Sequence, residues 1–193
     1  ELAVLDRFGE IHLRRRDDAH VDGDRLARAE GLDLVFLDVL EAALEAHWRS
    51  EGFLSQEHEA ARFAAGAKAL RRFAEDAAGA GDRIIAVERP FSVRIGPDRV
   101  RGRYDAVRET TAGLVITDYK SGDMRDPARA RQRARTSLQL QLYALAWEAE
   151  HGARPDAVEL HFLEGGVVGR VKPTDRQLQG AREKVERAAS GIR

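Results

Sequence analysis

The sequence predicts an α/β fold in which a mixed central β-sheet is flanked by α-helices. Helical apolar spacing dominates before residue 81, and strand-like runs rich in Val and Ile begin at residue 83. A long helical stretch then separates two groups of these runs. A chain of 193 residues is long enough for one domain with a proper core. We therefore expect a single domain over 1–193, with a helical part (1–81) and a sheet with its flanking helices (82–193).

Helices are expected before and after the sheet. One is predicted over residues 34–49, and Ser55 is a predicted N-cap of a second that ends within 77–82. A third is predicted over 128–150, and a last one begins at Thr174.

Strands are expected over three stretches and in one hairpin at the C-terminal side. Pro90 favours an edge position for the first strand or a bulge at that point, because proline cannot donate a ladder hydrogen bond. A Gly-Pro-Asp turn at 96–98 leads into the next strand. The expected strands cover residues 83–95, 100–107, 114–119, 157–163 and 167–172.

The stretch 102–122 carries the most informative polar residues. If its turn comprises residues 109–112, Arg108 pairs with Gly113, and Asp105 then lies across from Ile116. Side chains repeat every second residue along a strand, so Asp105, Asp118 and Lys120 would all project to one side. A turn one residue shorter or longer would break this convergence.

Two adjacent carboxylates repel each other unless a cation lies between them or one is protonated. Mg²⁺ suits such a pair, because it binds one or two carboxylates and completes its shell with water and phosphate oxygens. A lysine beside them can act on the attacking water or on the developing phosphate charge. These are the parts of a metal-dependent phosphodiester hydrolase.

Composition excludes several other classes. The net charge of −1 excludes an indiscriminate polycation, and the lack of cysteine excludes disulfides, thiol catalysis and cysteine-bound metal. No phosphate-binding G-x-x-x-x-G-K-[ST] loop is present, so an ATP-driven motor would lie elsewhere. The sequence contains no apparent membrane span or signal pattern, so a cytoplasmic protein with no membrane partner is expected.

The ordered motifs GRYD (102–105), ITDYKSG (116–122) and QLQLY (139–143) resemble the RecB-like branch of the PD-(D/E)XK nucleases. In particular, they resemble the nuclease domain at the C-terminal end of bacterial UvrD-like helicases. The similarity covers residues 87–192 and is weaker over 34–81.

The resemblance implies a Mg²⁺- or Mn²⁺-dependent deoxyribonuclease. An exonuclease coupled to a helicase in DNA repair or recombination is its usual setting, and this chain would be part of a larger helicase-nuclease. The implied partners are single-stranded DNA or duplex ends and helicase motor domains in the same or a partner chain. Asp105 and Asp118 would bind the metal, Glu88 would assist, and Lys120 would act on the water or the leaving phosphate. Without the resemblance, Asp105 would be a surface aspartate or a partner of Arg103, and Glu88 an ordinary edge-strand glutamate. Asp118 and Lys120 would then be an exposed ion pair at a strand end.

A second implied group lies on the helix predicted over 128–150. Gln139 and Tyr143 would position the DNA or the lysine, whereas without the resemblance they would be a pair at the core boundary. Arg131 and Arg135 are expected on the same helical face, where they would meet backbone phosphates. A solvated helix surface is the alternative for these arginines.

The family's metal-binding histidine has no clear equivalent. The expected Gly-x-x-x-His pattern is one residue short at Gly9-Glu10-Ile11-His12. Either His12 serves, or the histidine precedes Glu1, or it has been lost. Many relatives also carry four cysteines around an iron–sulphur cluster, so their absence here indicates a trimmed piece or a clusterless member.

Two rival functions remain open. A nuclease-inactive module could keep the fold and bind DNA as a scaffold for a helicase. A metal-dependent enzyme acting on another substrate is the third hypothesis, because fold and acids alone do not name a substrate.

Overall fold

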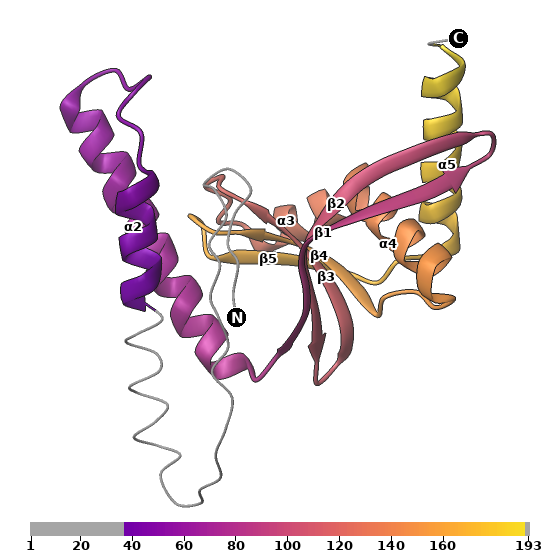
Figure 1. Ribbon diagram of the computed structural model, residues 1–193, viewed down its shortest axis with the longest axis horizontal. Coiled ribbons are helices and arrows are strands. Elements are labelled where there is room, and N and C mark those ends of the chain that lie inside the picture. The colour runs from indigo at the N-terminus through magenta and orange to yellow at the C-terminus, as the bar shows by residue number, and fades with distance from the viewer. Residues whose placement is uncertain (1–36, 192–193) are drawn as a thin grey trace, which may run out of the picture.

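The computed structural model describes residues 37–191, and the predictions for residues 1–32, including His12, lie outside this range. Residues 37–47 are helical. The order of the remaining elements is visible in Figure 1. They are α2 (Gln56–Ala80), β1 (Arg83–Ile95), β2 (Asp98–Thr110), β3 (Gly113–Lys120), α3 (Pro127–Thr136), α4 (Leu138–His151), β4 (Ala157–Phe162), β5 (Val167–Val171) and α5 (Asp175–Ser190).

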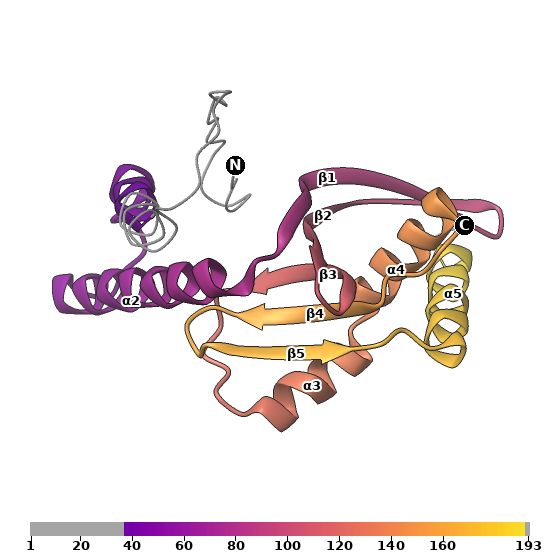
Figure 2. The ribbon, with the colours of Figure 1, turned by 90° about the horizontal axis from the view of Figure 1, so that it is seen from below.

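The five strands form one mixed sheet in the order β1-β2-β3-β4-β5. The β3–β4 pair is parallel and the other three pairs are antiparallel. A parallel pair needs a long crossover, and α3 and α4 supply it. In Figure 2, α3 runs alongside β5, and α5 stands beside the far end of the β1–β2 hairpin. The predicted α/β class, with a mixed sheet flanked by helices, is confirmed.

The main core lies between the sheet and α3, α4 and α5. Tyr104, Ile116, Leu140 and Leu145 are at most 1% exposed in it. Burying each such side chain contributes about 1.5–3 kcal/mol, so this layer holds α4 firmly against the sheet. Among the described helices, none combines the length and the apolar character that crossing a bilayer requires.

The caps predicted for two helices are confirmed. Ser55 caps α2 by accepting a hydrogen bond from the His58 amide, and Thr174 and Gln177 form a capping box on α5. The predicted edge position of β1 is also confirmed. Phe73 of α2 packs edge-on against Tyr119, with ring centroids 5.6 Å apart. The helical part thus reaches the sheet on the side of Tyr119.

The single helix predicted over 128–150 is wrong, because Ser137 divides it into α3 and α4. Ser137 has extended dihedrals (φ −67°, ψ 114°), and its hydroxyl caps α4 by accepting a hydrogen bond from the Leu140 amide. A serine that bonds nearby backbone groups competes with helix continuation. Arg131 and Arg135 therefore lie on a different helix from Gln139, and the common face predicted for them is wrong.

The predicted register of β2 and β3 is wrong by two residues. Thr110, not Arg108, pairs with Gly113, so the hairpin turn is shorter than expected. Asp105 consequently does not lie across from Ile116. The last printed pair is Ala106 with Thr117, and one further step brings Asp105 opposite Asp118. A shift of two preserves the side on which each residue projects, so the expected convergence survives the error.

A polar network lies on the opposite face of the sheet from Asp118. Glu159 on β4 is fully buried and forms ion pairs with Arg108 and Arg170. It also accepts a hydrogen bond of 2.8 Å from the Thr117 hydroxyl, and Arg108 forms an ion pair with Asp82. The network links β2, β3, β4 and β5 on the face of the sheet opposite Asp105 and Asp118.

We expect Glu159→Ala to lower the free energy of unfolding by about 3–5 kcal/mol, because it leaves two guanidinium groups without their shared partner. Urea unfolding would measure the loss. Glu41→Ala, which breaks the exposed pair with Arg71, is the matched control and should cost at most about 1 kcal/mol. Equal losses in the two variants would contradict the assignment.

His161, which packs beside Phe73 and Tyr119, predicts a pH dependence of stability. Burial lowers the pKa of His161 below its ordinary value of 6.5; Arg108 lowers it further, while Glu159 and Asp76 oppose the shift. The unfolded chain then binds the proton more readily than the folded protein.

We therefore expect stability to be complete above pH 6.5 and to decrease as the pH falls through 6.5 towards the lowered folded-state pKa. Denaturant titrations over this range would measure it. His161→Phe should flatten that part of the profile, and an unchanged profile would exclude His161 as its cause.

Candidate active site

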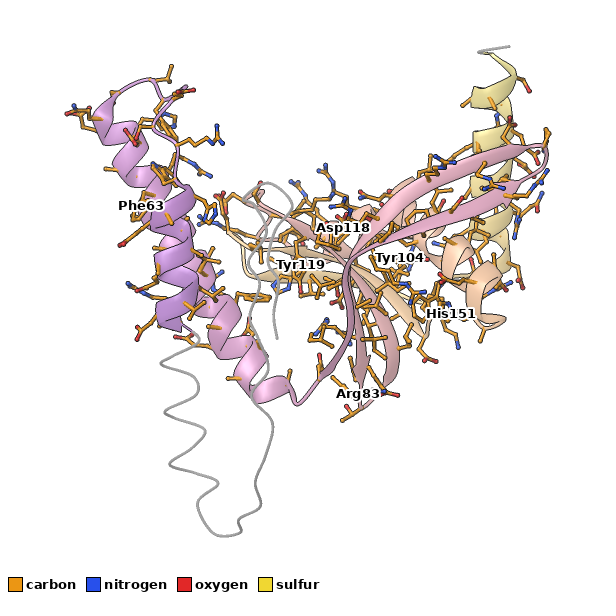
Figure 3. All side chains as sticks on the ribbon, viewed as in Figure 1. Phe63, Arg83, Tyr104, Asp118, Tyr119 and His151 are labelled. Atoms are coloured by element: carbon orange, nitrogen blue, oxygen red, sulfur yellow. The ribbon has the colours of Figure 1, made fainter. Side chains whose placement is uncertain are left out.

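Asp118 and Lys120 lie at the end of β3, in the middle of the sheet. Asp118 is labelled in Figure 3. The Asp118 side chain is 1% exposed, and its Oδ2 lies 2.6 Å from the Lys120 Nζ. Apart from this ion pair, Oδ2 has no hydrogen-bond partner among the described residues. The lysine side chain is 38% exposed, so it connects the buried carboxylate with solvent.

Asp105 joins this pair from β2. Its Oδ2 accepts a 2.9 Å hydrogen bond from the Tyr119 amide, which fixes the carboxylate against β3. The Tyr143 hydroxyl lies 3.4 Å from Asp105 Oδ1 and 3.5 Å from Asp118 Oδ1. One hydroxyl thus lies between the two carboxylates and within reach of both.

Gln139 completes a closed ring of polar contacts. Its Nε2 donates to the Tyr143 hydroxyl (2.8 Å), and its Oε1 accepts from the Lys120 Nζ (3.1 Å). Because Gln139 and Tyr143 are one turn apart on α4, both can face the end of β3. The ring runs from Asp118 through Lys120, Gln139 and Tyr143 back to Asp118.

Strand β2 changes phase next to Asp105. Buried side chains of β2 include Tyr104 and then Val107, so the inward-facing side switches between them, at Asp105. Across the ladder, β1 has the same switch at Glu88, the only described non-glycine residue with a positive φ (49°). Such kinks re-aim side chains in a strand. A sequence argument based on two-residue alternation could not have predicted this switch of the inward-facing side.

The electrostatics follow from burial. Burial raises the pKa of Asp118, and the Asp105 charge raises it further, while the Lys120 ammonium opposes both effects. Burial and the two carboxylates also raise the pKa of Tyr143, so its hydroxyl stays protonated and can donate. Uncompensated negative charge at this point is therefore unfavourable.

Glu88 lies near the carboxylates along the backbone but binds an arginine. The pairs Val87–Ala106 and Arg89–Tyr104 place Glu88 across from Asp105. Its carboxylate accepts a 3.1 Å hydrogen bond from Arg103. Among residues 37–191, no three His, Asp or Glu side chains converge in the way needed to hold a metal. Two carboxylates, Asp105 and Asp118, are what the described residues offer.

These two carboxylates fit a hard divalent cation of the Mg²⁺ type. They face the same tyrosine hydroxyl, and each raises the cost of charging the other. Mg²⁺ is commonly held by one or two carboxylates, with waters and substrate phosphates as its other ligands.

Arg131 and Arg135 lie apart from the carboxylates in a basic pocket of about 620 Å³. It is formed by α3, β5 and the start of α5, and three more cations line it: Arg170, Lys172 and Arg176. Sequence reasoning missed these three, although their close spacing beside the capping residue Thr174 is a visible signal. The Arg135 carbonyl accepts hydrogen bonds from Gln141 and Gln177, so the pocket adjoins the start of α4.

We expect Asp118→Asn to keep or raise the melting temperature of the metal-free protein, because it removes a buried charge whose carboxylate form is disfavoured. The same change should abolish any rise in melting temperature caused by Mg²⁺ or Mn²⁺. Thermal unfolding with and without metal measures both effects. Asp123→Asn, at an exposed aspartate, is the control and should behave as the wild type. A full metal response in Asp118→Asn would contradict the expectation.

Comparison with known proteins identifies the family to which the chain, including Asp118, Lys120, Gln139 and Tyr143, is similar. The model of the PD-(D/E)XK nuclease superfamily matches residues 5–193, nearly the whole chain and all of the polar ring. No individually curated protein matches the sequence. Members of this superfamily are generally hydrolytic nucleases that use divalent metal ions. By this match the chain belongs to the PD-(D/E)XK nuclease superfamily.

Proposed function

We propose that the protein is a metal-dependent deoxyribonuclease that hydrolyses phosphodiester bonds at the Asp105–Asp118 pair. The observation that carries the proposal is the closed polar ring, in which a buried carboxylate, a lysine, an amide and a tyrosine contact one another. A surface ion pair would not need this supporting set. Two of these residues come from α4, whose central residues are buried in the core.

Asp105 and Asp118 are the proposed ligands of Mg²⁺ or Mn²⁺. A bound cation would supply Lewis-acid activation of water and neutralise charge on the phosphate. The protein's own part is to hold the two carboxylates together. The Tyr119 amide fixes Asp105, and burial between the neighbouring strands fixes Asp118.

Lys120 is the proposed catalytic cation, acting on the attacking water or on the leaving phosphate. Its Nζ contacts Asp118 and Gln139, and these two contacts hold the ammonium group beside the carboxylates. Gln139 and Tyr143 are positioning residues in this proposal. Gln139 orients the ammonium, and Tyr143 keeps one proton between the two carboxylates.

Arg131 and Arg135 are proposed to bind the DNA backbone in the basic pocket. The support is local: five cations and no acid line it, in a chain whose net charge is −1. Glu88 is proposed to assist at the metal once its carboxylate leaves Arg103, because it lies across from Asp105.

The finer assignment is a RecB-like exonuclease coupled to a helicase in DNA repair or recombination, within one domain of a larger protein. Its support is the order of GRYD, ITDYKSG and QLQLY along the chain. Helicase motor domains, in the same or a partner chain, and single-stranded DNA or duplex ends are the proposed partners, and the cytoplasm is the proposed location.

A nuclease-inactive DNA-binding scaffold is the second candidate. The observation favouring it is that Lys120 neutralises Asp118 and Arg103 binds Glu88, with no third acid or histidine converging among the described residues. In this alternative the ring stabilises the end of β3 and does no chemistry.

Digestion of end-labelled single- and double-stranded DNA in Mg²⁺ or Mn²⁺ separates the two candidates. We expect the wild type to cleave and Asp118→Ala to lose both cleavage and divalent-metal binding. Lys120→Ala should keep metal binding but cleave about 10²–10⁴-fold more slowly, since it removes the acid–base or charge-stabilising group. The products also report polarity and distinguish exonuclease from endonuclease action.

Asp123→Ala and Lys184→Ala are the matched controls and should cleave normally. Cleavage that persists in Asp118→Ala or in EDTA would contradict the proposed enzyme. Absence of both cleavage and metal binding in a folded wild type would favour the scaffold.

A further inference from the structure

Three exposed arginines lie on the outer side of the β1–β2 hairpin. Arg94 is on β1, and Arg99 and Arg101 are on β2. The alternate residues Phe91, Val93 and Ile95 are buried against the core, so the arginines project the other way. We call Arg94, Arg99 and Arg101 the arginine face.

The arrangement of charge on this face is unfavourable for the protein alone. Arg94 and Arg99 are direct cross-strand partners, and like charges placed directly opposite each other destabilise a strand pair. None of the three arginines forms an ion pair with a residue in 37–191. On the same strand as Arg94, by contrast, Arg83 pairs with Glu109 and Arg89 pairs with Glu150.

The hairpin that carries the face is held in place at two points. Phe91 packs over Gly102, where any added Cβ would collide with the ring, so the two strands stay close. Gly96 at the tip (φ 58°) lies against the Glu186 side chain of α5. Figures 1 and 2 show the hairpin extending from the sheet to α5. The arginines are thus displayed on a supported ribbon, which lowers the entropic cost of binding.

The arginine face leads to the candidate active site. Arg99 and Arg101 lie six and four residues before Asp105 on β2, which is about 20 Å and about 13 Å along the strand. A row of cations on the β-strand that leads to the carboxylates suits a repeating anion, because each phosphate of a nucleic-acid strand can meet one guanidinium.

We propose that the arginine face binds the phosphodiester backbone of DNA outside the linkage that is cut, guiding one strand to Asp105 and Asp118. The inference rests on the proposed nuclease function for its setting, but the binding itself needs neither metal nor cleavage. It assigns a binding role to three residues outside the motifs and outside the basic pocket.

The test compares Arg94→Gln/Arg99→Gln/Arg101→Gln with a control that loses the same charge, Arg49→Gln/Lys68→Gln/Lys184→Gln. Binding of a labelled DNA oligonucleotide is measured in EDTA by fluorescence anisotropy over a range of salt concentrations. Losing three phosphate contacts should weaken binding by about tenfold or more and lower the slope of log K against log salt by about 2. The control triple should match the wild type.

A second measurement separates this role from damage to the catalytic site. Cleavage of bis(p-nitrophenyl) phosphate, which is too small to reach the hairpin, should be unchanged in the arginine variant, while KM for DNA rises. The melting temperature should stay the same or rise, because the repulsion between Arg94 and Arg99 is removed.

Unchanged DNA affinity and salt slope in the arginine variant, or equal losses in both triples, would overturn the proposal. If the wild type cut no DNA but its binding depended on the arginine face, the proposed nuclease would fail and the inference would stand. If the wild type cut DNA and the arginine variant bound DNA as the wild type does, the proposed nuclease would stand and the inference about the arginine face would fail.

Discussion

The Asp118 carboxylate is 1% exposed at the centre of a five-stranded sheet, and the polar architecture around it compensates for that burial. Desolvation and the neighbouring Asp105 both raise its pKa, so a cation and a proton donor have to lie within reach. Lys120 supplies the first and Tyr143 the second, and Gln139 links the two. The position of α4 follows from this requirement as much as from its apolar face.

Buried carboxylates on the two faces of the sheet are compensated in different ways. On the α4 side, the carboxylates keep one exposed cation and a shared proton, which leaves room for a ligand to take over as counterion. On the other side, Glu159 is saturated by Arg108, Arg170 and Thr117. Because β3 contributes Thr117 to one face and Asp118 to the other, the network around Glu159 supports the strand that carries Asp118. The same strands thus carry a fully paired carboxylate on one face and carboxylates open to a further counterion on the other.

Much of this arrangement could be predicted from local signals. Asp105, Asp118 and Lys120 were placed on one side by strand periodicity, and the caps at Ser55 and Thr174 by residue type. The register was wrong because the turn after Thr110 is two residues shorter than its composition indicated. The kink at Glu88 was missed because it depends on tertiary packing. The break at Ser137 was missed because it depends on one side chain's competition with the backbone for hydrogen bonds. Of the basic pocket, only the part on one helix was visible, since β5 and α5 join it through the fold.

The break at Ser137 has a consequence for how such a protein can diversify. Were 127–151 a single rod, any substitution that tilted its basic end would also swing Gln139 and Tyr143 away from the carboxylates. With an extended residue between them, α3 packs on β5 while α4 is anchored separately in the aromatic core around Tyr104. The helix that lines the basic pocket and the helix that contacts Lys120 through Gln139 are thereby separate elements, linked by the hydrogen bond from Gln141 to the Arg135 carbonyl. Substitutions on the exposed side of α3 can therefore change the charge of the pocket while the backbone that holds Gln139 and Tyr143 stays in place.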